Sequence, residues 1–94
     1  MDKTTIKQRT VSILKLCFPK TVIDSDLLEY VDFIDDLGMD SITFISLIVE
    51  LESDFHIHIP DHLLLMENFR NMNMTIDHLN SLLAAPKREN EGEL

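Results

Sequence analysis

Apolar residues recur at helical spacing in three stretches of the chain, and each stretch predicts one amphipathic helix. The first helix is expected over residues 4–18, because Pro19 drives the residue before it out of the α region. The second is expected over residues 41–54, and the last over residues 72–84 with Asn71, Asn73 or Thr75 as its N-cap. The expected buried positions are Ile6, Thr10, Ile13, Leu14 and Cys17 in the first helix, Phe44, Leu47, Ile48, Leu51 and Phe55 in the second, and Ile76, Leu79 and Leu83 in the last.

The segments between these helices are also informative. Residues 19–40 form a long connection, and connections of this length usually have a function. We expect one helical turn near residues 25–30 and a sharp turn at Gly38. Residues 55–60 alternate like a strand, but Pro60 stops the pattern and no partner strand is available. We therefore expect an extended link there, followed by a short helical turn over residues 61–66. The apolar residues expected to hold the long connection against the core are Leu27, Leu28, Val31, Phe33, Ile34 and Leu37.

These elements predict an all-α fold. We expect a small four-helix bundle of three principal helices and one short helix, with a long loop between helices 1 and 2. The 94 residues suffice for one core, so a single domain is expected over residues 1–85. Residues 86–94 contain too few apolar side chains to order themselves and are expected to form a loose tail.

The second helix carries a second apolar flank. Ile42, Ile45 and Val49 lie roughly 130° from the expected core stripe of that helix, at about 100° of rotation per residue. A helix that is apolar on more than one face is either buried in the centre of the fold or uses the extra face to bind a partner. The pattern alone leaves both interpretations open.

Charge narrows the classes of partner. The net charge is −9, and residues 21–69 contain twelve acids but neither Lys nor Arg. This balance argues against binding to nucleic acid or to an anionic membrane surface, because both need clustered cations. An acidic centre steers basic partners towards it, although solvation alone also accounts for such a surface. No apolar run approaches the roughly 18–20 residues of a membrane span, and no signal peptide is evident, so a cytoplasmic location is expected.

Two other residue types receive ordinary interpretations. The single cysteine, Cys17, excludes an internal disulfide framework and is expected to be a core residue rather than a reactive thiol. The spacing of His56, His58 and His62 invites a zinc site, but no convincing fourth ligand is present, so we predict no metal. Met66 and Met72 are expected to fill the core. The apolar run over residues 63–66 is expected either to close the core or to line a cavity.

The segment before the second helix holds the most informative motif, Asp35-Asp36-Leu37-Gly38-Met39-Asp40-Ser41-Ile42. It places a serine at the mouth of an apolar helix, after a glycine turn and an aspartate. The N-terminus of a helix presents unpaired N–H groups and the positive end of the helix dipole, which suit a phosphate. Asp and Ser are also common N-caps, so the motif by itself leaves an ordinary capping role open.

The sequence resembles acyl carrier proteins and related phosphopantetheine carrier domains. The resemblance starts from the motif Leu37-Gly38-Met39-Asp40-Ser41-Ile42, continues through Glu50-Leu51-Glu52 and Ile59-Pro60-Asp61, and covers about residues 4–84. It implies that Ser41 carries a covalent 4′-phosphopantetheine arm, taken from coenzyme A by a separate phosphopantetheinyl transferase. The thiol of that arm would hold an acyl or aminoacyl group as a thioester. The protein itself would then be no enzyme, and Gly38, Met39 and Asp40 would border the attachment site.

The resemblance also assigns the second apolar flank. In relatives the second helix is read by partner enzymes, so the resemblance implies a recognition surface formed by Ile42, Ile45 and Val49 together with Asp36 and Glu52. The expected partners are the transferase, an acyl- or aminoacyl-loading ligase and downstream synthase or transferase enzymes with basic docking patches, and the carrier itself is expected to be a monomer.

Two departures from fatty-acid-type carriers affect the pathway. Thr43 and Ser46 stand where such carriers usually have acids. The segment from Pro60 to Arg70 is also longer than the corresponding segment of fatty-acid-type carriers. These features favour a specialised fatty-acid or polyketide-type pathway, with an aminoacyl or peptidyl carrier, including the D-alanyl type, as the alternative. Two other classes compete: an unmodified helical interaction module of the same fold, and a small acid–base enzyme, which so small a bundle disfavours.

Overall fold

The computed structural model describes residues 1–84. It contains the helices α1 (Lys3–Cys17), α2 (Ser41–Phe55) and α3 (Met72–Ala84), and the 3₁₀ turns η1 (Leu28–Tyr30), η2 (Asp61–Leu63) and η3 (Met66–Phe69). Within the described residues the only β-type pairing is an isolated antiparallel bridge between Asp32 and Asn71. The all-helical class predicted from the sequence is therefore confirmed. The tail expected over residues 86–94 lies outside the described residues.

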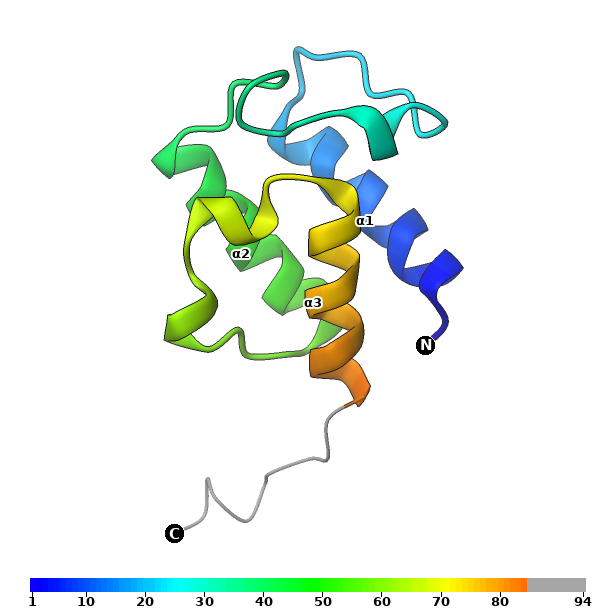
Figure 1. Ribbon diagram of the computed structural model, residues 1–94, viewed down its shortest axis with the longest axis vertical. Coiled ribbons are helices and arrows are strands. Elements are labelled where there is room, and N and C mark those ends of the chain that lie inside the picture. The colour runs from blue at the N-terminus through cyan, green and yellow to red at the C-terminus, as the bar shows by residue number, and fades with distance from the viewer. Residues whose placement is uncertain (85–94) are drawn as a thin grey trace, which may run out of the picture.

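The short fourth helix is the main correction to the predicted architecture. The single helical turn expected over residues 61–66 is replaced by two 3₁₀ turns, η2 and η3, separated by Leu64 and Leu65. Pro60 precedes the first of them with an extended backbone, and Leu64 breaks it with a non-helical conformation. The three principal helices thus enclose the core with two short turns beside them rather than with a fourth helix (Figure 1).

Capping explains the helix ends. The helix α1 starts at Lys3, one residue earlier than predicted, because the Asp2 carboxylate accepts a hydrogen bond of 2.8 Å from the Thr5 N–H. It ends at Cys17, and Phe18 is its C-cap. The helix α2 extends one residue beyond the prediction, to Phe55, and α3 has the predicted bounds. Of the three N-caps considered for α3, Asn71 is the one that acts, since its side-chain oxygen accepts a hydrogen bond of 2.8 Å from the Met74 N–H.

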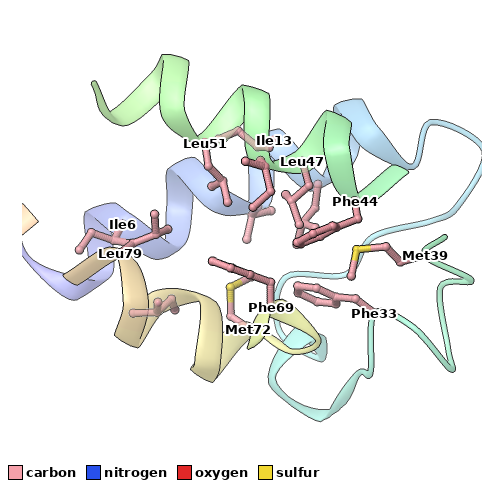
Figure 2. Packing of buried hydrophobic residues seen from close by; sticks show 14 of the residues in the cluster. Ile6, Ile13, Phe33, Met39, Phe44, Leu47, Leu51, Phe69, Met72 and Leu79 are labelled. Atoms are coloured by element: carbon pink, nitrogen blue, oxygen red, sulfur yellow. The ribbon is translucent and has the colours of Figure 1, made fainter. Parts of the chain in front are cut away.

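The core lies between the inner faces of the three helices. All five positions predicted for the α2 stripe are buried, and so are four of the five predicted for α1. Figure 2 shows side chains from the three helices and the long connection meeting in one cluster. In α3, Ile76 and Leu79 are buried and Leu83 is half-buried against the cluster, as the helical spacing predicted. Met72 is also buried, and Met66 is half-buried against the cluster, as expected.

Cys17 is less buried than the sequence indicated. The side chain is half-buried at the edge of the core rather than inside it, because α1 ends at this residue. Burial raises the pKa of the Cys17 thiol, and the carboxylate of Glu50 adds to the shift. The thiol therefore stays protonated at neutral pH, which agrees with a packing role.

The long connection between α1 and α2 passes over one end of the helices (Figure 1). Leu28 and Phe33 fix it to the core, with 1% and 0% of their surface exposed. Leu27 was expected to do the same, but it is 54% exposed, because the η1 turn directs its neighbour Leu28 inward. The remaining residues predicted to anchor the connection are half-buried against the core: Val31, Ile34 and Leu37.

Candidate functional site

Ser41 is the first residue of α2, and it is exposed to solvent. Asp40 is the N-cap: its carboxylate accepts a hydrogen bond of 2.8 Å from the Thr43 N–H. This bond lowers the pKa of Asp40, so the cap stays ionised at neutral pH. The hydroxyl of Ser41 therefore stands at the positive end of the α2 dipole, where a negatively charged group bound to it would be favoured.

A compact turn over residues 32–39 leads into this serine. The Met39 N–H donates a hydrogen bond of 2.9 Å to the Phe33 carbonyl oxygen, and the Gly38 N–H donates one of 3.1 Å to the Ile34 carbonyl oxygen. Met39, which is predicted to border the attached group, has a side chain that is 3% exposed and lies beside Phe33 and Phe44 (Figure 2). Its structural role is thus to anchor the turn in the core.

Gly38 gives the turn its sharp bend. Its φ is +73°, a left-handed conformation that L-residues with a side chain rarely adopt. An added Cβ would meet no atom within 4 Å, so a substitution there would be strained only through the backbone.

We expect Gly38→Ala to lower the free energy of unfolding by about 1 kcal/mol, the approximate cost of a left-handed alanine. Urea unfolding followed by circular dichroism measures this loss. Gly38→Asn is the control, because asparagine tolerates the left-handed region better and should cost less. If the alanine variant were as stable as the wild type or more stable, the left-handed backbone at Gly38 would impose no strain on a side chain, which would contradict this prediction.

An apolar groove opens directly beside Ser41. Its volume is about 360 Å³, and Ser41 contributes to its wall at the N-terminal end of α2. The sequence left open whether residues 63–66 close the core or line a cavity, and both are found: Leu63, Leu64 and Met66 pack against the core, and Leu64 also lines the groove. The complete lining is Ser41, Phe44, Ile45, Ile48, Val49 and Leu64.

The second apolar flank of α2 faces solvent. Ile42, Ile45 and Val49 are 77%, 61% and 54% exposed. The structure thereby decides between the two interpretations of this flank, because a centrally buried helix would cover these side chains. The flank runs along α2 from the residue after Ser41 and shares Ile45 and Val49 with the groove.

The two acids predicted to accompany this flank have additional structural contacts. Asp36 is exposed, but its carboxylate accepts a hydrogen bond of 2.7 Å from the Asp32 N–H. Glu52 is half-buried, and its carboxylate accepts one of 2.8 Å from the Ile59 N–H. Each carboxylate therefore stabilises its own segment, the turn before α2 or the link after it.

Arg70 contacts the turn before Ser41, and the sequence pattern did not predict this contact. Its Nε lies 2.7 Å from Asp32 Oδ2, and its terminal nitrogen lies 3.2 Å from Asp35 Oδ2. The available signal was its position, since it is the only Lys or Arg in residues 21–86. Helical periodicity could not pair it with an acid 38 residues earlier in the chain.

The described residues offer no group of three His, Cys, Asp or Glu side chains that could hold a metal ion. His56, His58 and His62 are exposed, and His56 is the left-handed C-cap of α2. In the same part of the chain, none of the helices has the length and hydropathy needed to cross a membrane.

Comparison with known proteins adds two findings to this geometry. Residues 18–79 match the model of the family described as "Phosphopantetheine attachment site". The chain is also 29% identical over 84 residues to the mitochondrial acyl carrier protein of Saccharomyces cerevisiae, an alignment that covers 86% of this chain and 65% of the relative, less than two thirds of its length. The exposed Ser41 at the start of α2 lies within the matched residues. Because the family model covers most of the chain, the protein belongs to the phosphopantetheine-attachment family of carrier proteins.

Proposed function

We propose that Ser41 is the attachment point of 4′-phosphopantetheine and that the protein is an acyl carrier. The observation that supports this best is the exposed Ser41 hydroxyl at the N-terminus of α2, beside an apolar groove. When attached, the group supplies a thiol on a long arm that holds a cargo as a thioester. The carrier itself would catalyse nothing, because its serine serves as an anchor for a group added by another enzyme.

The residues around Ser41 fit such a group. The serine oxygen is accessible to a transferase, and the helix dipole favours the charge of a phosphodiester. The Asp40 carboxylate is occupied by its hydrogen bond with Thr43, which fixes the first turn of α2. The groove beside the serine is lined almost entirely by apolar side chains and suits the hydrocarbon part of an acyl cargo.

The test of this proposal is modification in vitro. Purified protein is incubated with coenzyme A and a broad-specificity phosphopantetheinyl transferase, and the intact mass is recorded. We expect an increase by one phosphopantetheine per chain. A folded protein that gains no mass with this transferase, nor with a second transferase of different specificity, would refute the carrier role and favour an unmodified interaction module.

We further propose that the recognition surface consists of Ile42, Ile45 and Val49, flanked by Asp36 and Glu52. The exposure of the three apolar side chains and the excess of acids over residues 21–69 support this assignment. Apolar anchors contribute most of the affinity at such a surface, whereas the acids raise the rate of encounter with basic patches. The expected partners are the transferase, a loading ligase and downstream synthase or transferase enzymes.

We expect Ile45→Asp to lower kcat/KM of a partner enzyme about tenfold, because it places a charge in the apolar contact. The measurement is transferase kinetics with the variant as substrate, with circular dichroism to confirm that helicity is retained. Ser12→Asp is the matched control, since it adds the same charge on an exposed position of α1. A variant at Ile45 that is turned over as fast as the control would place the recognition surface elsewhere.

For the pathway we propose a specialised fatty-acid or polyketide-type synthesis in the cytoplasm, served by a monomeric carrier domain over residues 1–85. Thr43 and Ser46 support a specialised role, because they leave the first half of α2 without the acids of primary fatty-acid carriers. An aminoacyl or peptidyl cargo, including the D-alanyl type, is the alternative. Loading assays with purified acyl and aminoacyl ligases on the modified protein distinguish the two.

A further inference from the structure

The turn over residues 32–39 is closed by its own hydrogen bonds. The Asp32 carboxylate accepts bonds from the Ile34 N–H at 2.9 Å and the Asp35 N–H at 2.8 Å. The Asp36 carboxylate accepts a bond from the Asp32 N–H in return. The turn is therefore a compact unit, which Phe33 and Met39 attach to the core from one side.

Arg70 connects this unit to the rest of the fold. It follows η3 and precedes α3, and it contacts the turn through both its side chain and its backbone. The guanidinium binds Asp32 at 2.7 Å and Asp35 at 3.2 Å, and the Arg70 carbonyl oxygen accepts a hydrogen bond of 2.6 Å from the Phe33 N–H. The isolated bridge between Asp32 and Asn71 continues the same contact by one residue.

The location of this contact relates it to Ser41. Phe33, which is bound to Arg70 through its N–H, accepts a hydrogen bond from the Met39 N–H through its carbonyl. Met39 is two residues before Ser41 and is held in the core. Arg70 is thus linked through the backbone pair of Phe33 and Met39 to the segment that leads into the N-terminus of α2.

We propose that Arg70 is a positioning residue for the modification of Ser41: it fixes the turn over residues 32–39 in the one arrangement that presents this serine to the transferase. The inference rests on the proposed function, since it concerns the same serine. The Arg70 guanidinium forms ion pairs with two carboxylates, and its planar arrangement of N–H donors fixes their direction. The backbone hydrogen bond between Arg70 and Phe33 adds a second point of attachment. The pKa of Asp32 is lowered chiefly by its hydrogen bond with Arg70, so both partners are charged at neutral pH.

The test compares Arg70→Ala with Arg9→Ala. Arg9 makes an analogous contact at the opposite end of α2, where its Nε lies 2.8 Å from Asp54 Oδ2 and its terminal nitrogen donates a hydrogen bond of 2.6 Å to the Asp54 carbonyl oxygen. Loss of either arginine removes a similar anchor, but only Arg70 touches the turn before Ser41. Arg70→Lys retains the charge without the fork and is expected to lie between wild type and Arg70→Ala.

Two measurements carry the comparison, both at a temperature where all variants are folded by circular dichroism. In transferase kinetics, we expect Arg70→Ala to raise KM for the carrier about fivefold with kcat unchanged, because only chains with the turn in place bind productively. Arg9→Ala should leave KM unchanged. In amide hydrogen exchange, the N–H groups of Phe33 and Met39 should exchange about fivefold faster in Arg70→Ala and at the wild-type rate in Arg9→Ala.

The outcomes separate this inference from the proposed function. Wild-type protein that no transferase modifies would overturn both proposals together. Wild-type protein that is modified, with an unchanged KM in Arg70→Ala, would overturn the positioning role alone. An equal rise of KM in Arg9→Ala would also overturn it, because the effect would then reflect general destabilisation.

Discussion

Replacing Ser41 by alanine is expected to abolish the addition of phosphopantetheine completely. The transferred group needs an accessible hydroxyl at the site of attachment, and alanine has none. Ser41 is exposed at the first position of α2, where the side chain makes no contribution to the core. The variant should therefore remain folded, and intact mass spectrometry after incubation with coenzyme A and the transferase should show the unmodified mass only.

The matched control for this variant is Ser46→Ala. Ser46 is an exposed serine on the same helix, one to two turns after Ser41. It is not preceded by the Gly-Met-Asp sequence that precedes Ser41. This control should gain one phosphopantetheine as the wild type does. If Ser41→Ala is modified, the attachment point is not Ser41. If Ser46→Ala also loses the modification, the loss in Ser41→Ala does not identify the attachment point. Equal urea midpoints for the two variants and the wild type would show that folding does not cause the difference.

Replacing Phe69 by alanine is expected to lower the free energy of unfolding by about 3–5 kcal/mol, the range typical of truncating a buried phenylalanine. Phe69 has no exposed surface, and its ring lies 6.0 Å from that of Phe44 and 5.2 Å from that of His78 between ring centroids. The substitution would leave a cavity between α2 and α3. A loss of this size is a large fraction of the stability of a small domain.

Urea unfolding monitored by circular dichroism measures this effect, and Ile42→Ala is its control. Ile42 is 77% exposed, so its truncation should change the unfolding free energy by less than about 0.5 kcal/mol. A small loss for Phe69→Ala, comparable to that of the control, would contradict the central position of this ring in the core. His78 is half-buried, and its contact with Phe69 is part of the same packing.

The sequence alone determined the three principal helices and the inner face of each. Helical periodicity suffices for this because neighbours at three and four residues share a face whatever the rest of the chain does. Pro19, Asp40 and Asn71 act at the ends of these helices through local sterics or capping. The motif before α2 likewise placed Ser41 at a helix start, since the relation between glycine turn, cap and helix is local in the chain.

The tertiary structure decided everything that depends on residues distant in sequence. The pairing of Arg70 with Asp32 joins residues 38 positions apart, which no periodicity relates. The burial of Met39, the exposure of Leu27 and the groove beside Ser41 depend in the same way on how the long connection and the segment after Pro60 cover the helices. Local pattern fixes which face of a helix is apolar, but only the packing of the other elements determines whether that face is covered, and this is why α2 exposes Ile42, Ile45 and Val49.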